Sequence, residues 1–120
     1  MDVWHVIQVL DDAMDGDRAE PAEVSRAAWA IFATIPANPF YQQYLAALTA
    51  VLVLALRKWQ GANEMEAAGE ADERTFCARA GFYDLVLFCC HLCGIADADA
   101  KCIRLYGETY ADYIAEWRAA

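Results

Sequence analysis

The sequence predicts an all-α protein, a compact bundle of four to five helices with a long apolar central hairpin. Apolar residues recur at intervals of three and four along most of the chain, which is the spacing that lines one face of a helix. Proline, glycine and aspartate separate these stretches where helices begin and end. No stretch alternates apolar and polar residues as a strand would. A length of 120 residues, 59% of them hydrophobic, fits a single domain spanning residues 1–120.

The first two helices are expected on either side of a polar loop. Residues 2–14 form the first helix, because apolar residues repeat there at helical spacing: Val3, Ile7, Leu10 and Met14. A polar loop follows over Asp15–Pro21, and Pro21 suits the first turn of the second helix. That helix carries an apolar stripe, which Trp29 and Phe32 widen: Val24, Ala28, Ile31 and Ile35. We expect the segment Pro36-Ala37-Asn38-Pro39 to stop it and to start the next helix.

The remaining helices are delimited by capping residues. Asn38 is a good N-cap and Pro39 a good first residue for a third helix, which runs at least to Gln60 and continues toward a C-terminal cap at Gly69. The fourth helix begins at an Asp72 cap, reaches Cys93 and is ended by Gly94. A fifth begins at Asp97 or Asp99 and has one aromatic-rich stripe, formed by Ile103, Tyr106, Tyr110, Tyr113 and Trp117.

The third and fourth helices are predicted to pair as the central hairpin, turning near residue 70. This register places Arg57 beside Asp84. Asp84 lies within an apolar run, where an unpaired charge would be costly. We therefore expect Asp84 to bond to Arg57, Lys58 or the Trp59 indole, so Asp84 and Arg57 are interpreted as structural polar residues.

Composition and charge exclude several classes of partner and predict a cytoplasmic protein. The formal charge of −9 argues against binding to nucleic acid or to an anionic membrane, since both are negatively charged. The opening Met-Asp-Val-Trp-His has no basic region before an apolar run, so we expect no secretory signal peptide. The uncharged run Phe40–Leu56 is shorter than a typical membrane span and is interpreted as a buried helix.

No catalytic, metal or cofactor site is predicted. Cys90-His91-Leu92-Cys93 has the spacing of a redox pair, but it closes a helix, where the dipole favours the thiol over the thiolate. The five cysteines, Cys77, Cys89, Cys90, Cys93 and Cys102, are interpreted as reduced core residues, with a zinc site as the alternative. There is no phosphate-binding glycine loop and no nucleophile motif, and Ser25 is the only serine. We therefore expect no cofactor.

One short segment supplies an enzymatic alternative. Tyr83-Asp84-Leu85-Val86-Leu87-Phe88, followed by Cys93-Gly94-Ile95-Ala96-Asp97, resembles a helix of the all-α nucleoside triphosphate pyrophosphohydrolases of the MazG type. The resemblance implies magnesium-dependent release of pyrophosphate, with Asp84 as the final acidic ligand. The sequence departs from the family where a preceding glutamate is replaced by Gly81, and the facing stretch around Arg57 has no carboxylates.

The leading hypothesis is a non-enzymatic protein that acts by association. Residues 85–93 are apolar on every side except at His91, so a small domain has more apolar surface than it can cover. We expect a homo-oligomer, a complex with another protein, or both. Small acidic inhibitors and phage-type accessory proteins share this composition. The candidate interface residues are Tyr106, Tyr110, Tyr113 and Trp117.

Overall fold

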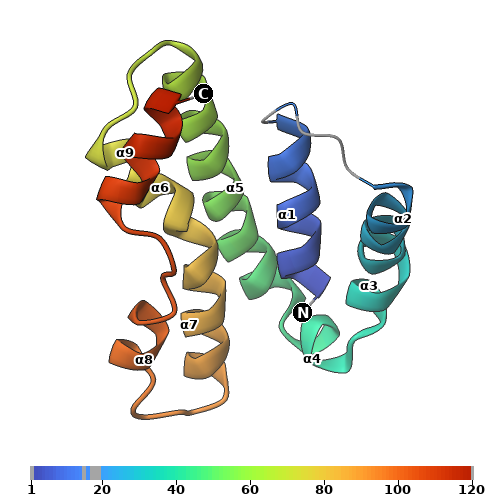
Figure 1. The fold of residues 1–120 in the computed structure, drawn as a ribbon. Helices are drawn as coiled ribbons and strands as arrows, with labels where there is room; N and C mark the ends of the chain where they lie inside the picture. The colour runs from blue at the N-terminus through green and yellow to red at the C-terminus, as the bar shows by residue number, and fades with distance from the viewer. Residues whose placement is uncertain (1, 15, 17–19, 120) are drawn as a thin grey trace. The chain divides into compact units, whose positions relative to one another are not determined.

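The computed structural model describes residues 2–14, 16 and 20–119, and all regular structure in them is helical (Figure 1). The predicted all-α class is therefore confirmed. The chain divides into two compact units, residues 1–45 and 46–120. The expectation of a single domain over residues 1–120 stays a prediction.

The first unit contains four short helices and one π-helical turn. They are α1 (Asp2–Met14), α2 (Pro21–Trp29), the π-helical turn η1 (Ala30–Thr34), α3 (Ile35–Ala37) and α4 (Pro39–Gln43). α1 packs against α2 and η1, and His5 Nε2 donates a hydrogen bond to the Glu23 carbonyl oxygen at 3.0 Å. The small side chains of Ala27 and Ala30 are buried. Of the predicted loop Asp15–Pro21, Asp15 and residues 17–19 lie outside the described residues.

The second predicted helix ends within the expected segment Pro36-Ala37-Asn38-Pro39, because α3 ends at Ala37 and Asn38 has an extended backbone. Its path continues through η1 and α3 to Ala37. Pro36 is accommodated because it lies in the first turn of α3, where a missing backbone N–H costs little. The predicted cap that follows is confirmed: Asn38 Oδ1 accepts a hydrogen bond from the Tyr41 N–H at 3.1 Å, and Pro39 is the first residue of α4.

The predicted third helix is broken near its start. α4 ends at Gln43, Tyr44 has a non-helical backbone with φ −111° and ψ 25°, and α5 (Leu45–Ala67) begins after it. The rings of Phe40 and Tyr44 lie 4.9 Å apart at this break. The C-terminal end of α5 agrees with the predicted cap at Gly69. Gly69 has φ +79°, and the Glu70 N–H donates to the Met65 carbonyl at 2.8 Å.

Among the described residues, α5 alone is long and apolar enough to cross a membrane by length and composition. The core helices of soluble proteins pass the same test.

The predicted fourth helix has three parts: α6 (Glu73–Arg79), the 3₁₀ turn η2 (Ala80–Phe82) and α7 (Tyr83–Leu92). The Asp72 cap is confirmed. Asp72 Oδ1 accepts from the Arg74 N–H at 2.8 Å, and Thr75 Oγ1 accepts from the Asp72 N–H at 3.0 Å. At η2, a Cβ on Gly81 would lie 3.5 Å from Ala55 Cα, so the two backbones approach closely there.

The predicted fifth helix is wrong as a continuous element. The structure has α8 (Asp99–Ile103) and α9 (Tyr110–Ala119), separated by a non-helical stretch over residues 104–109. Gly107 disfavours helix there, and Thr109 Oγ1 accepts from the Asp112 N–H at 3.2 Å, which starts α9 anew. α9 packs against α6.

Candidate functional site

Uncovered apolar side chains are the most extensive functional feature of the described residues. Neither α1 nor α7 contains a fully buried residue, although both are rich in apolar side chains. Large apolar side chains are exposed on both units: Leu10, Met14, Val24, Trp29, Ile31, Phe32, Leu45, Val53, Leu54, Leu56, Ile95, Ile103, Leu105 and Tyr106. Single exposed apolar residues are common in soluble proteins, so only groups of neighbouring ones within one unit bear on binding.

The highest exposures occur side by side in the first unit. Phe32 is 82% exposed and Trp29 is 69% exposed, and they are one helical turn apart. Val24 and Ile31 are exposed on the same stretch of α2 and η1, while Ala27 and Ala30 point inward. We call Val24, Ala28, Trp29, Ile31 and Phe32 the α2 stripe. Its tryptophan and phenylalanine face solvent, although large aromatic side chains are ordinarily mostly buried.

The α2 stripe begins a long part of the chain without charged residues. No Asp, Glu, Lys, Arg or His occurs between Arg26 and Arg57. Within that interval, the exposed large side chains include Trp29, Phe32 and Leu54. Trp29 and Phe32 belong to the first unit and Leu54 to the second. Phe32 has no charged residue within four positions along the chain, whereas Trp29 lies three positions after Arg26 and Leu54 lies three positions before Arg57.

The four aromatic residues predicted as an interface are placed differently from one another. Tyr106 is exposed and its ring lies 4.4 Å from that of Tyr83. Tyr110 and Trp117 are half-buried. Tyr113 is only 6% exposed, so its side chain faces the interior of its own unit. The helix that was expected to align all four is interrupted before Tyr110, which separates Tyr106 from the others.

A polar cluster connects α5, α6 and α9. Tyr113 Oη donates to Glu66 Oε2 at 2.5 Å and lies 2.6 Å from Thr75 Oγ1. Arg79 donates to Glu66 Oε1 at 3.0 Å and to Asn63 Oδ1 at 2.8 Å. We call these five residues the Glu66 cluster. Thr75 is 1% exposed, so the cluster extends into the core of the second unit.

The electrostatics of the Glu66 cluster favour a structural role. Burial and the Glu66 carboxylate raise the pKa of Tyr113 to about 12, so the phenol stays protonated and donates at neutral pH. The Glu66 carboxylate accepts from two donors and balances the Arg79 charge. A phenol with a raised pKa is a poor general acid near pH 7. The cluster therefore joins three helices rather than supplying a proton donor.

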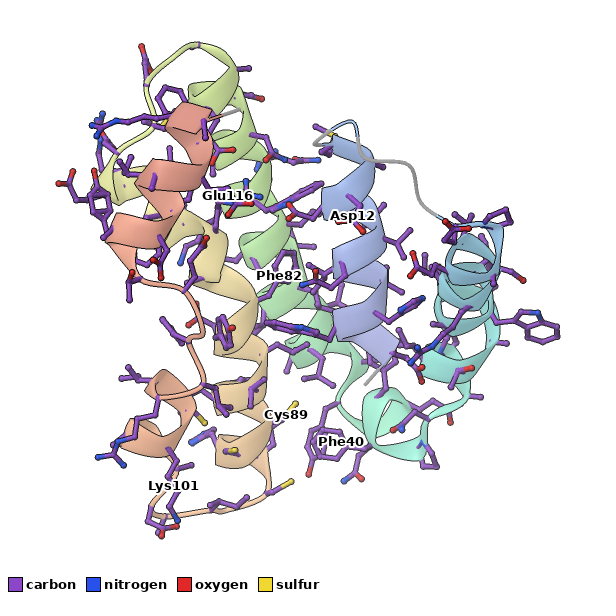
Figure 2. All side chains as sticks on the ribbon, in the orientation of Figure 1. Asp12, Phe40, Phe82, Cys89, Lys101 and Glu116 are labelled. Atoms are coloured by element: carbon purple, nitrogen blue, oxygen red, sulfur yellow. The ribbon has the colours of Figure 1, made fainter. Side chains whose placement is uncertain are left out.

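A second carboxylate interaction lies near the cluster. Burial and the neighbouring Glu116 raise the pKa of the Glu108 carboxyl, and Arg79 partly opposes this. Glu116 lies on the side of α9 toward α5 (Figure 2). Two neighbouring carboxylates repel each other when both are charged, so the neutral form of one of them is favoured. The stability of the contact between Glu108 and Glu116 therefore depends on pH.

Sequence reasoning missed the Glu66 cluster. The Glu66 side chain is only 16% exposed, which its polar sequence neighbours do not indicate. Glu66 and Tyr113 are 47 positions apart, so no local motif links them. The only sequence signal is helical spacing, which places Asn63 and Glu66 on one face of α5.

Asp84 and Arg57 lie at the surface. Asp84 Oδ2 is 3.8 Å from Lys58 Nζ, and both side chains are about half exposed. Arg57 is also exposed. The Asp84 carboxylate is therefore hydrated rather than buried in its apolar run, and the ion pair contributes less than about 1 kcal/mol.

The cysteines are more exposed than the sequence suggested. Cys102 is buried, whereas Cys77 and Cys93 are exposed. The core interpretation is therefore correct for Cys102 and wrong for Cys77 and Cys93. Burial raises the pKa of Cys102 and of Cys89, which favours the unreactive thiol form. Within the described ranges, no three His, Cys, Asp or Glu side chains converge as a metal site would require.

Comparison with protein-family models, curated proteins and solved structures finds no match to this chain. The α2 stripe presents apolar surface to solvent. The Glu66 cluster satisfies most of its polar groups internally, but the Nδ2 of Asn63 is buried and has no hydrogen-bond partner among the described residues.

Proposed function

We propose that the protein is non-enzymatic and acts through association, as a homo-oligomer or as an inhibitor or accessory protein bound to another protein. The observation that carries this proposal is the exposure of Trp29 and Phe32 on one side of α2 and η1. Tryptophan is strongly enriched among the residues that dominate binding energy at protein interfaces. Covering these side chains would remove from water apolar area that the chain itself leaves exposed.

Charge supports a protein partner over other macromolecules. The formal charge of −9 repels nucleic acid and anionic lipid, so we propose a partner in neither class and a cytoplasmic location. Acidic residues are absent between Arg26 and Arg57, where much of the exposed apolar surface lies. Apolar contact with a protein surface is therefore the interaction that this region is suited to make.

We further propose that the helices form a bundle of four to five members around the hairpin of α5 with α6 and α7. Three contacts within the second unit support this arrangement: Gly81 with Ala55, Asp84 with Lys58, and Arg79 with Glu66. Arg79 meets a later position of α5 than Gly81 and Asp84 do, as an antiparallel pair requires. Within that bundle, Arg57 and Asp84 would serve as structural polar residues at the surface.

The enzymatic alternative is a degenerate pyrophosphohydrolase of the MazG type. The nearest basic group to Asp84 is Lys58, and Gly81 packs against Ala55 rather than presenting a carboxylate. A magnesium site needs several carboxylate oxygens at that level. Magnesium-dependent release of pyrophosphate from any nucleoside triphosphate would favour this alternative over association.

The test of association is the mass of the purified chain in solution. Light scattering during size-exclusion chromatography, with native mass spectrometry of the same fractions, would report stoichiometry and any bound metal or protein. A concentration-dependent oligomer or a defined complex supports the proposal. A strict monomer that captures no protein and hydrolyses a nucleotide would contradict it.

A further inference from the structure

We propose that the α2 stripe is an isologous interface that binds a second copy of this chain. This inference rests on the proposed function and names its partner. An isologous contact uses the same patch on both copies, so the patch must be complementary to itself. The α2 stripe meets this condition because Trp29 and Phe32 lie one turn apart, and an antiparallel approach about a two-fold axis places Trp29 of one copy against Phe32 of the other.

The distribution of charge along the chain favours a second copy over a basic partner. From Pro21 to Ala37 the only charged residues are Glu23 and Arg26, one of each sign. This region is therefore neutral in a chain with a formal charge of −9. Two acidic copies repel each other over most of their surfaces, and they meet without that repulsion where the surface is neutral. A basic partner would be attracted to the acidic surfaces instead.

The exposed apolar area of the α2 stripe approaches what a specific dimer needs. At 69% and 82% exposure, Trp29 and Phe32 together present roughly 300 Å² of apolar surface. Val24 and Ile31 add roughly 150 Å² at 48% and 44% exposure. Two copies therefore contribute roughly 900 Å². A specific interface buries at least about 1,000 Å² in total, so these four side chains of the two copies supply most of that minimum.

Arg26 extends the same surface by a further turn. It is exposed and lies three positions before Trp29, so its guanidinium can reach the interface rim. Tryptophan and arginine are the residue types most enriched among interface residues with large binding contributions.

The experiment compares the dissociation constant of the full chain with those of two variants by sedimentation velocity over a concentration series. Phe32→Ser removes the most exposed member of the stripe. Ile103→Ser is the matched control, because Ile103 is 60% exposed and lies at the end of α8. Loss of a dominant interface residue weakens association by about 30-fold or more, whereas the control stays within about threefold of the parent. Circular dichroism checks that both variants remain helical.

Each outcome decides between specific possibilities. A dimer weakened by Phe32→Ser and unchanged by Ile103→Ser supports the inference. An oligomer that neither variant weakens overturns the role of the α2 stripe but leaves the proposed function standing. A parent chain that is monomeric throughout the series overturns the inference. If that monomer binds zwitterionic phosphatidylcholine vesicles and Phe32→Ser abolishes the binding, the stripe is a lipid-binding surface and the proposed function fails as well.

Discussion

Replacement of Tyr113 by phenylalanine tests the Glu66 cluster directly. The substitution deletes one hydroxyl and keeps the ring, which lies 5.6 Å from that of Phe76, so no cavity is created. It removes the hydrogen bond to Glu66 Oε2 at 2.5 Å and the contact with Thr75 Oγ1 at 2.6 Å. A hydrogen bond to a charged group contributes about 1.5–3 kcal/mol, and Arg79 still binds Glu66. We expect Tyr113→Phe to lower the free energy of unfolding by about 2 kcal/mol at pH 7.

Urea unfolding followed by circular dichroism measures this change, with Tyr110→Phe as the matched control. Tyr110 lies on the same helix and contacts the Phe76 ring at 5.8 Å, outside the Glu66 cluster. We expect the control to change the free energy of unfolding by less than about 0.5 kcal/mol. A double-mutant cycle with Glu66→Gln then isolates the energy that couples Tyr113 to Glu66. If Tyr113→Phe is no more destabilising than Tyr110→Phe, the cluster does not hold α9 as argued.

Tyr113→Phe is also expected to change how the free energy of unfolding depends on pH above neutrality. The pKa of Tyr113 is raised from 10 to about 12, so the folded state favours the protonated phenol. Its stabilising contribution is therefore complete below about pH 10 and is lost as the pH rises toward 12. Tyr113→Phe should remove this part of the alkaline loss. In an absorbance titration of tyrosinate, the component near pH 12 should disappear with the hydroxyl.

Three further predictions concern local features. Asp72→Ala removes the cap of α6 and should cost about 1 kcal/mol of unfolding free energy in urea unfolding, whereas Glu70→Ala should cost less than about 0.5 kcal/mol. Burial and Glu116 raise the pKa of the Glu108 carboxyl, so the folded state loses stability as the pH rises above the ordinary pKa of glutamate. Glu116→Gln should therefore reduce the fall in Tm between about pH 4 and pH 7. The buried Cys102 thiol should react with iodoacetamide only after unfolding, while the exposed cysteines react in the native protein, as peptide mass spectrometry would show.

Each of these predictions has a clear contrary result. Equal destabilisation by Asp72→Ala and Glu70→Ala would mean that the cap contributes nothing. An unchanged Tm difference in Glu116→Gln would mean that the two carboxyl groups do not interact. Native alkylation of Cys102 at the rate of the exposed cysteines would show that its thiol is not buried in the native protein.

Local capping chemistry was predictable from the sequence. Asn38 and Asp72 begin helices with the side-chain hydrogen bonds expected of N-caps, and Gly69 ends α5 with a positive φ. These features depend on interactions within a few residues, so the residue type and its immediate neighbours determine them. The all-α class followed from apolar spacing for the same reason.

Helix interruptions and tertiary polar contacts were not predictable in this way. Nothing near Tyr44 marks a break, because a tyrosine within an apolar run satisfies the helical pattern. The exposure of Trp29 and Phe32 was also missed, since an amphipathic pattern does not show which side the chain will cover. Glu66 and Tyr113 meet only through the packing of α9 on the rest of the second unit. Such contacts depend on register between helices, which the periodicity of one helix does not determine.

The close approach at Gly81 sets the spacing of two polar contacts at once. Arg79 precedes Gly81 by two residues and reaches Glu66, while Asp84 follows it by three residues and reaches Lys58. The separation of the backbones at Gly81 therefore determines how far both pairs of side chains must extend. A Cβ at position 81 would meet Lys58 Cδ at 3.4 Å and Ala55 Cα at 3.5 Å, which is ordinary van der Waals contact. Only a side chain longer than that of alanine would therefore push the two backbones apart and lengthen both contacts together.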